Sequence, residues 1–252
     1  MSKQRSMVAR VEAADPAASE LGIGNYRLGA ALLVMGAVVI AIQLDAWLIS
    51  VLQSLPRFVS DAVNRLEPFG HGFGGVVVIG TAALVARLSY RQTGLLALSS
   101  FGSGMTANVL KVLVVRRRPG ALLPGEFPEL PRLSFVSNGD LPEFTERLSS
   151  SSLQSFPSAH TAAAFGLAVG LGALFPRARL WWLLLAAGCG LQRVMASRHF
   201  TSDVFVGAGI GLIVGSLVVR KTAAWTGQGS QTADDVPLLS VVSEVTERQR
   251  VA

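Results

Sequence analysis

Six long apolar stretches divide this chain, and they constrain its fold more than any other feature of the sequence. They cover residues 28–44, 72–88, 94–115, 159–175, 180–196 and 203–219. A helix needs roughly 20 apolar residues to cross the hydrocarbon core of a bilayer, and these stretches lie at or just below that length. Backbone polar groups inside a bilayer must be satisfied within the spanning segment, which favours helices. The sequence therefore predicts an all-α, integral-membrane bundle of six helices.

The composition favours a membrane protein over a soluble one. Of the 252 residues, 50% are hydrophobic and 15% are charged, whereas a soluble domain carries about 25% charged residues. The net charge of +6 is compatible with nucleic acid, an anionic membrane surface or an anionic substrate. The basic residues flank the apolar stretches and show no zinc-finger spacing, so we expect no nucleic-acid partner. The single cysteine, Cys189, lies inside an apolar stretch and is interpreted as a packing residue.

Lysine and arginine in the short connections predict the orientation of the bundle, because cytoplasmic loops carry an excess of these residues. In a six-helix arrangement the connections on one side carry Arg87, Arg91, Arg177, Arg179, Arg220 and Lys221. That side is predicted to be the cytoplasm, with both termini on it. The basic cluster at 116–118 falls on the outer side and breaks this rule, so it needs another explanation.

The polar segments predict the domain organisation. We expect a cytoplasmic N-terminal tail (1–27), a six-span domain (28–221) and a disordered cytoplasmic C-terminal tail (222–252). Segment 45–71 mixes apolar and polar residues, which predicts a helix lying along the outer membrane surface. Segment 116–156 is the longest polar connection, and connections of this length are commonly lids or mobile segments.

The first block of chemically capable residues runs from Lys111 to Arg118 and Pro119. Lys111 and Arg118 are seven residues apart, close to two helical turns, so both can face one anion. The alternative is that Lys111 extends to the outer surface, although a charge this deep in a span usually faces the interior or a water-filled cavity. Arg116 and Arg117 point away from that face and are predicted to meet lipid headgroups or solvent.

The second block, Pro157-Ser158-Ala159-His160, opens an apolar stretch. The first N–H groups of a helix have no intrahelical partner and carry positive partial charge, so a phosphate can bind there. Ser158 can cap the helix and offer its hydroxyl to a phosphate oxygen. An ordinary capped helix start with a histidine beside it is the alternative interpretation of this block.

The third block contains Arg193, His199 and Asp203. His199 and Asp203 are four residues apart, which on a helix places the carboxylate against one ring nitrogen and leaves the other nitrogen to react. A plain surface His–Asp pair is the alternative. Arg193 lies inside an apolar stretch, where a charge is costly without an anionic partner. All three blocks map to the outer side, and together they predict a phosphate site with two histidines.

These blocks resemble the signature of the type 2 phosphatidic acid phosphatase (PAP2) superfamily, in its membrane lipid phosphatase branch. The signature reads Lys-x6-Arg-Pro, Pro-Ser-Gly-His and Ser-Arg-x5-His-x3-Asp. The first block matches it in full, and the third matches at its arginine, histidine and aspartate. Ala159 replaces the usual glycine, and Gln192 replaces the usual serine. The resemblance covers about residues 72–219.

The resemblance implies a role for each matching residue. It implies that His199 is the nucleophile and forms a phosphohistidine, that Asp203 orients it, and that His160 protonates the leaving group and then activates water. It also implies that the phosphate is bound by a further set: Lys111, Arg118, Ser158, Ala159 and Arg193. No metal or other cofactor is expected, since the cations already stabilise the phosphate charge.

The expected function is a membrane phosphatase that hydrolyses a lipid phosphomonoester or diphosphate. The candidate substrates are phosphatidic acid, phosphatidylglycerol phosphate, undecaprenyl diphosphate and the lipid A phosphates. We expect the protein in the bacterial inner (plasma) membrane, with the site at the outer ends of the helices, facing the periplasm or outside. Its partners are the lipid phosphate and the membrane lipids, and the sequence leaves the oligomeric state open.

Three alternatives stand beside this function. The first is phosphate transfer between two lipids, and the second is a transporter-like protein in which the intramembrane charges line an ion path. The third is a soluble vanadium haloperoxidase, which shares the phosphate-site motif. The apolar stretches disfavour that last alternative.

Overall fold

The computed structural model describes residues 16–123, 126, 130–133 and 144–230. The chain divides into two compact units, Asp15–Val219 and a second unit made of Met1–Ala14 and Arg220–Ala252. The described part of the second unit is the end of the last helix. The predicted tails lie largely outside the described residues, as does much of segment 116–156, and their boundaries stay predictions.

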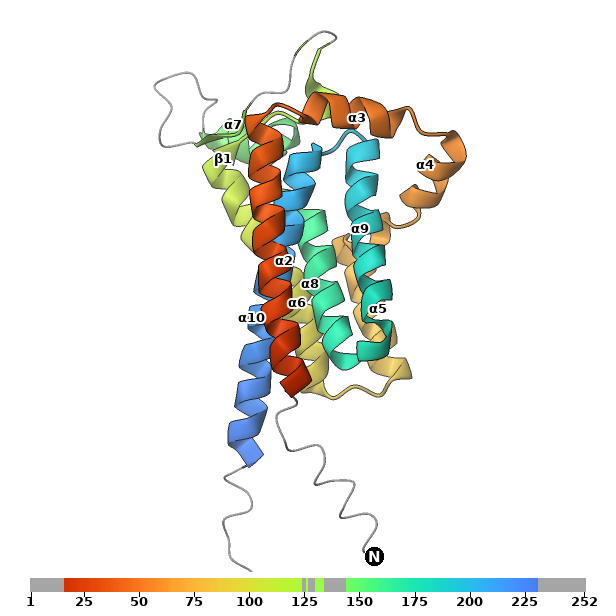
Figure 1. Cartoon of the computed structure of the whole chain (residues 1–252), viewed down its shortest axis with the longest axis vertical. Coiled ribbons are helices and arrows are strands. Elements are labelled where there is room, and N and C mark those ends of the chain that lie inside the picture. The colour runs from red at the N-terminus through yellow and green to blue at the C-terminus, as the bar shows by residue number, and fades with distance from the viewer. Residues whose placement is uncertain (1–15, 124–125, 127–129, 134–143, 231–252) are drawn as a thin grey trace, which may run out of the picture. The chain divides into compact units, whose positions relative to one another are not determined.

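Six long helices make up most of the described chain, and each overlaps one of the predicted apolar stretches (Figure 1). They are α2 (Pro16–Ala41), α5 (Gly72–Val85), α6 (Tyr90–Leu113), α8 (Ala159–Leu174), α9 (Arg179–Met195) and α10 (Thr201–Ser230). Among the described residues, strands are limited to the antiparallel pair β1 (Val114–Val115) and β2 (Arg132–Leu133). The predicted all-α fold class is therefore confirmed.

The number of membrane spans is a separate question from the number of helices. Within the described residues, two segments are long and apolar enough to cross a membrane, Gly24–Ala41 and Thr201–Thr222. A helix pair bent by 70°, Arg57–Phe69 with Gly72–Val85, adds up to one more, and Ala159–Leu174 is a shorter apolar helix. These helices support a membrane bundle, and the count of six spans stays a prediction.

Segment 45–71 holds three short elements rather than one helix: α3 (Asp45–Gln53), α4 (Arg57–Asn64) and the 3₁₀ turn η1 (Glu67–Phe69). Helix α3 lies across one end of the bundle, which we call the α3 end, and α4 lies toward the side of the bundle (Figure 1). Pro56 directly precedes α4 and Pro68 lies inside η1. Proline lacks a backbone N–H and cannot continue a helix, so the segment is broken where the sequence analysis predicted one surface helix. The remaining short elements are η2 (Pro119–Ala121), α7 (Phe144–Ser149), η3 (Ser151–Leu153) and η4 (Pro176–Ala178).

Helix α8 lies at the centre of the bundle, and small residues let its neighbours approach closely. A Cβ atom at Gly166 would lie 2.0 Å from the Ser99 carbonyl oxygen of α6. A Cβ atom at Gly211 of α10 would lie 2.5 Å from the Ala162 carbonyl oxygen of α8. Neither position accepts a side chain, so close backbone packing of the kind found between membrane helices holds α6, α8 and α10 together. The buried core around α8 includes Leu96, Leu167, Leu171 and Ala186.

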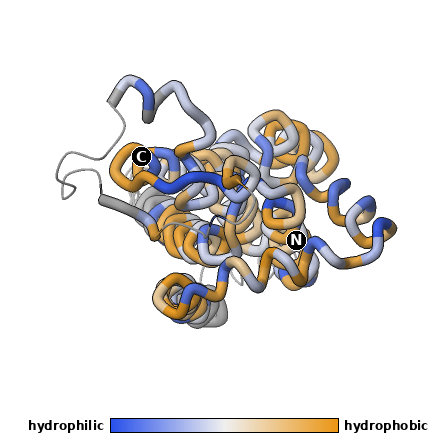
Figure 2. Tube along the Cα trace, turned by 90° about the horizontal axis from the view of Figure 1, so that it is seen from above, coloured by the Kyte–Doolittle hydropathy of each residue, from blue (hydrophilic) through white to orange (hydrophobic). Residues whose placement is uncertain are grey.

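Large apolar side chains also cover the outside of the bundle. Val76, Leu84, Leu98, Met105 and Leu184 are all more than half exposed. In the view from above, apolar colour predominates in the helices and hydrophilic colour is concentrated in the connecting segments (Figure 2). Exposed apolar surface of this extent is typical of a protein that faces lipid.

Candidate active site

The three predicted blocks meet at the α3 end. The end of α6, the start of α8, the end of α9 and the start of α10 all reach this region. A backbone hydrogen bond from Ser158 N to Asp203 O (3.1 Å) joins the starts of α8 and α10. A second bond, from Ser155 N to Arg116 O (3.0 Å), joins the segment before α8 to the residue that follows β1. The fold therefore brings together blocks whose residues are up to 92 positions apart, from Lys111 to Asp203.

Lys111 lies in the last turn of α6 and faces the interior of the protein. Its side chain is 8% exposed, and Nζ donates a hydrogen bond to the Gln154 carbonyl oxygen (2.7 Å). It lies within electrostatic range of Arg118, Asp203 and Arg193. The alternative in which Lys111 extends to the outer surface is excluded by this burial.

Arg118 and Arg193 bring two more cations to the same place. Within the described part of the chain, the buried Nε atoms of both side chains have no hydrogen-bond partner. Burial, followed by the charges of Arg198 and Arg193, lowers the pKa of Arg118 below its usual value. Cations crowded in this way, with donors left over, form a site for an anion with several acceptor oxygens.

The start of α8 has the geometry of an anion-binding helix end. Ser158 is fully buried and caps the helix: its Oγ accepts hydrogen bonds from Thr161 N (3.4 Å) and Thr161 Oγ1 (2.9 Å). In both contacts Ser158 is the acceptor, so its hydroxyl hydrogen is available to an incoming oxygen. Ala159 and His160 form the first turn of the helix, where backbone N–H groups point outward without intrahelical partners.

His199 is held by the backbone rather than by Asp203 alone. Its Nδ1 atom lies 2.7 Å from the Ser155 carbonyl oxygen and 3.7 Å from Asp203 Oδ2. A carbonyl oxygen can only accept, so Nδ1 carries the hydrogen and Nε2 keeps its lone pair. Burial lowers the pKa of His199 to about 4, against the raising effect of Asp203, so the ring is neutral at pH 7. The predicted geometry differs because His199 precedes α10, which begins at Thr201.

Asp203 is fully buried and its two oxygens have separate partners. Oδ1 accepts from Arg116 NH1 (2.5 Å), and Oδ2 accepts from Ser155 Oγ (2.6 Å) and Phe200 N (2.9 Å). The carboxylate is thus fixed by three donors at a short distance from the imidazole of His199.

The prediction for Arg116 is wrong. It was expected to meet headgroups or solvent, yet it is 2% exposed and bridges Asp45 and Asp203. The physical reason is that α6 ends at Leu113 and the chain continues as a strand, so helical periodicity does not apply beyond that residue. Arg117 is 30% exposed and pairs with Glu126 (3.1 Å).

All three histidines of the chain gather at this end. His160 lies within electrostatic range of His199, Arg193 and Lys111. The ring of His71 lies 5.6 Å from that of His160, tilted by 45°. His71 caps α5 by accepting from Phe73 N through Nδ1 (3.3 Å). His71 was not predicted from the sequence, although its place at the outer start of an apolar stretch was a signal for it.

Three further polar residues lie beside Arg193, and the sequence did not predict their contacts: Asn64, Glu67 and Gln192. Glu67 Oε1 lies 2.6 Å from Arg193 NH1, which supplies the anionic partner that a buried arginine needs. Gln192 Nε2 donates to Asn64 Oδ1 (3.3 Å) and Glu67 Oε2 (3.4 Å). The glutamine that departs from the family signature therefore connects α9 to segment 45–71. The signal available in the sequence was an acidic residue, Glu67, on the same side of the membrane as Arg193.

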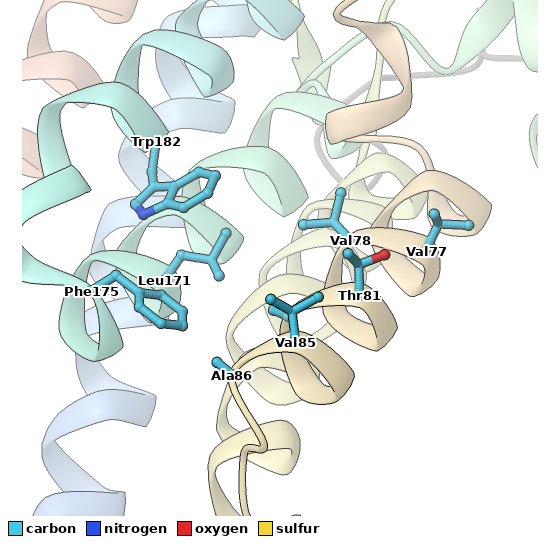
Figure 3. Close-up of a pocket in the computed structure, with 9 residues that line it drawn as sticks. Val77, Val78, Thr81, Val85, Ala86, Leu171, Phe175 and Trp182 are labelled. Atoms are coloured by element: carbon cyan, nitrogen blue, oxygen red, sulfur yellow. The ribbon is translucent and has the colours of Figure 1, made fainter.

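An apolar cavity of about 370 Å³ lies farther along the helices that carry the site (Figure 3). Its lining comes from α5, α8 and α9 and includes Val78, Val85, Leu171, Phe175 and Trp182. Leu171 follows His160 by 11 residues on α8, which is about 16 Å at 1.5 Å per residue. The cavity has the dimensions and chemistry for a hydrocarbon chain.

Residues 92–226 match the family model described as PAP2 superfamily. This match covers more than half of the chain. The chain belongs to the PAP2 superfamily. A structural comparison agrees with this assignment at the level of the fold: the crystal structure of Aquifex aeolicus LpxE has a TM-score of 0.53 and 23% identity, covering 70% of this chain and 95% of that one.

Two phosphatases of known name are similar in sequence. A lipid A 1-phosphatase of Rhizobium johnstonii is 32% identical over 109 residues, 43% of this chain and 39% of the relative. A decaprenylphosphoryl-5-phosphoribose phosphatase of Mycobacterium tuberculosis is 28% identical over 187 residues, 72% of this chain and 87% of the relative. The match to the Rhizobium protein thus spans about two fifths of that protein's length.

Proposed function

We propose that this protein is a membrane phosphatase that hydrolyses a lipid phosphate through a phosphohistidine, without a metal ion. The observation that carries the proposal is the meeting of Lys111, Arg118 and Arg193 with His160 and His199 at one end of the bundle. Arg118 and Arg193 both present a buried Nε donor that no described residue accepts. A tetrahedral phosphate offers acceptor oxygens for each of these donors.

The proposed first step is attack by His199. Its Nε2 lone pair forms a bond to phosphorus while the bond from phosphorus to the leaving oxygen breaks. His160 donates a proton to that oxygen, and the lipid leaves as an alcohol. The cations and the start of α8 stabilise the charge that builds on the three equatorial oxygens. The Asp203 carboxylate, 3.7 Å from Nδ1, offsets the positive charge of the phosphorylated imidazole.

The second step is hydrolysis of the phosphohistidine. His160, now neutral, removes a proton from water, and the oxygen attacks phosphorus from the side that the alcohol left. The bond to Nε2 breaks and inorganic phosphate is released. Both residues return to their starting protonation states, so the cycle balances.

We infer that the substrate is a lipid of the outer leaflet with long hydrocarbon chains. The apolar cavity supports long chains: its lining runs from Val77 to Ala86 and Phe175 at the far ends of α5 and α8, and only a long chain reaches about 16 Å along α8 from the site. The names of the two relatives describe a lipid A 1-phosphatase and a decaprenylphosphoryl-5-phosphoribose phosphatase. Among the candidates from the sequence, the lipid A phosphates and undecaprenyl diphosphate, a polyprenyl lipid, therefore come first. We also propose a location in the bacterial inner membrane with the site facing the periplasm, and the arginine and lysine pattern supports this orientation.

Phosphate release from purified protein tests this function. The protein in detergent with excess EDTA is given lipid A, a polyprenyl phosphate, phosphatidic acid and phosphatidylglycerol phosphate. We expect release from at least one lipid, no release by His199→Ala, and an acid-labile phosphoprotein in rapidly quenched wild type. Absence of release from every lipid, or full activity in His199→Ala, would refute the proposal.

A further inference from the structure

Arg116 and Asp45 form a buried ion pair beside the site, and neither belongs to the family signature quoted above. Arg116 NH2 lies 2.7 Å from Asp45 Oδ2, and Arg116 NH1 lies 2.5 Å from Asp203 Oδ1. The three side chains are at most 2% exposed. One guanidinium therefore bridges two carboxylates, one from the start of α3 and one from the start of α10.

Ser202 completes the network. Its Oγ donates to Asp45 Oδ2 (2.5 Å) and accepts from Arg116 NH1 (2.8 Å), and its backbone N donates to Asp45 Oδ1 (2.9 Å). The guanidinium carbon of Arg116 lies 4.2 Å from the centroid of the Phe200 ring, on the ring face. The residues on both sides of Thr201 are thus held to Arg116 or to Asp45.

This network surrounds the segment that carries His199. Asp203 Oδ2 lies 3.7 Å from His199 Nδ1 and also accepts from Phe200 N, the next residue in the chain. Ser155, whose carbonyl oxygen accepts from His199 Nδ1, also donates its Oγ to Asp203 Oδ2. The position of the imidazole therefore depends, through Ser155 and Phe200, on a carboxylate that Arg116 holds by its other oxygen. A shift of about 1 Å in a reacting group can cost about 100-fold in rate.

Only arginine satisfies this geometry. Its planar fork donates to two carboxylates at once, whereas lysine is a point charge with a compact head. A buried charge is also costly unless it is paired, and here the two terminal nitrogens of Arg116 meet two carboxylates and a hydroxyl. The arrangement is too specific for an exposed arginine that attracts lipid headgroups.

We propose that Arg116, anchored by Asp45, is a positioning residue that holds Asp203 and thereby aims His199 at the substrate phosphorus. This inference rests on the proposed phosphatase function. It explains why a cluster of three arginines stands on the outer side of the bundle: Arg118 serves the phosphate, and Arg116 serves the carboxylate behind the nucleophile.

Arg116→Lys, Arg116→Gln and Asp45→Asn test the proposal, with Arg117→Lys and Arg117→Gln as matched controls at the exposed neighbour. Rates of phosphate release give kcat and KM in detergent, and circular dichroism and size-exclusion chromatography report folding. We expect Arg116→Lys to lower kcat by about 10- to 100-fold with KM changed less than threefold. Asp45→Asn lowers kcat in the same way but by less, and both controls retain wild-type values.

The pH profile separates positioning from general damage to the fold. Lys111, Arg118, His160 and Asp203 lie within electrostatic range of His199. Arg116 pairs with Asp203 and Asp45 behind it, and Arg193 acts on His160. Arg116→Gln removes the cation that neutralises Asp203, so the imidazolium becomes more favourable. The acid limb of kcat/KM then moves to higher pH, while it stays in place in Arg117→Gln.

Different outcomes would overturn the positioning role of Arg116 and the proposed phosphatase function. Wild-type kcat and an unchanged acid limb in folded Arg116→Lys and Asp45→Asn would overturn the positioning role and leave the phosphatase intact. Asp45→Asn changes no side-chain shape, so it carries the test if Arg116→Gln does not fold. Loss of folding in Asp45→Asn as well would overturn the proposal in favour of a purely structural network. Absence of phosphate release by wild type would remove the proposed function, and this inference with it.

Discussion

Replacing Asp203 by asparagine tests the electrostatics of the site most directly. The carboxylate lies 3.7 Å from His199 Nδ1, and both side chains are at most 2% exposed. During attack the imidazole becomes positively charged, and Asp203→Asn removes the negative charge that faces it. Two unit charges about 4 Å apart interact by about 4 kcal/mol at an effective dielectric constant of about 20. Each 1.36 kcal/mol corresponds to about tenfold in rate, so we expect kcat to fall by about 10³-fold.

The same change also lowers stability, for a separate reason. Oδ1 and Oδ2 of Asp203 both accept hydrogen bonds, and an asparagine amide nitrogen must replace one of them. Whichever oxygen is lost, a donor then faces a donor, at a cost of about 1–3 kcal/mol. Arg116 keeps Asp45 as its partner, so the protein is expected to fold with a lowered Tm.

Steady-state phosphate release and thermal unfolding in detergent measure the two effects separately. Asp61→Asn, on the exposed face of α4, is the matched control and should change neither. A folded Asp203→Asn protein whose kcat falls less than tenfold would show that this carboxylate does not stabilise charge on His199. The electrostatic reasoning would then be refuted, whatever the change in Tm.

Three further predictions follow from the site and the cavity. Burial lowers the pKa of His199 to about 4, and protonation would remove the lone pair that attacks phosphorus. The ¹⁵N resonances of His199 should therefore report a neutral ring down to about pH 5. An imidazolium at pH 6 would contradict the assignment of His199 as the nucleophile. Val78→Trp fills the apolar cavity and should raise KM for a long-chain lipid phosphate but not for a short-chain one. The control Val76→Trp, on the exposed face of the same helix, should change neither KM. Equal effects of the two variants would argue against a hydrocarbon-chain site in this cavity. Glu67→Gln keeps a hydrogen-bond acceptor for Arg193 but removes the negative charge that competes with phosphate for that arginine. Vanadate should therefore inhibit the variant several-fold more strongly than the wild type. Weaker inhibition would show instead that Glu67 positions Arg193.

The long helices were predictable because hydropathy alone decides them. Each apolar stretch must satisfy its own backbone in lipid, and each overlaps one helix of the structure. Segment 45–71 was harder, since its apolar residues occur in short groups around Pro56 and Pro68. The sequence analysis predicted one surface helix there, and the structure has α3, α4 and η1.

The spacing of the motifs predicted which blocks of residues meet at the α3 end, but most of their contacts were not predictable. Lys111 and Arg118 were assigned to one face by helical periodicity, and they lie close together although the helix ends at Leu113 between them. Arg116 was misplaced by the same extrapolation. The neighbours of His71, Glu67 and Asp45 were unpredictable, because these side chains belong to a connection whose path depends on packing.

The sequence by itself determined a membrane-type helical bundle of the PAP2 superfamily, and it predicted the three blocks of residues proposed to bind phosphate and attack it. Those conclusions depend on local properties, namely apolar length and the residue types at fixed spacing. Only the tertiary structure decided that the Ser155 carbonyl holds the His199 ring and that Arg116 joins Asp203 to Asp45. Such contacts join segments up to 158 residues apart, from Asp45 to Asp203. They form only where burial forces each polar atom to find a partner, and no local pattern in the sequence records that choice.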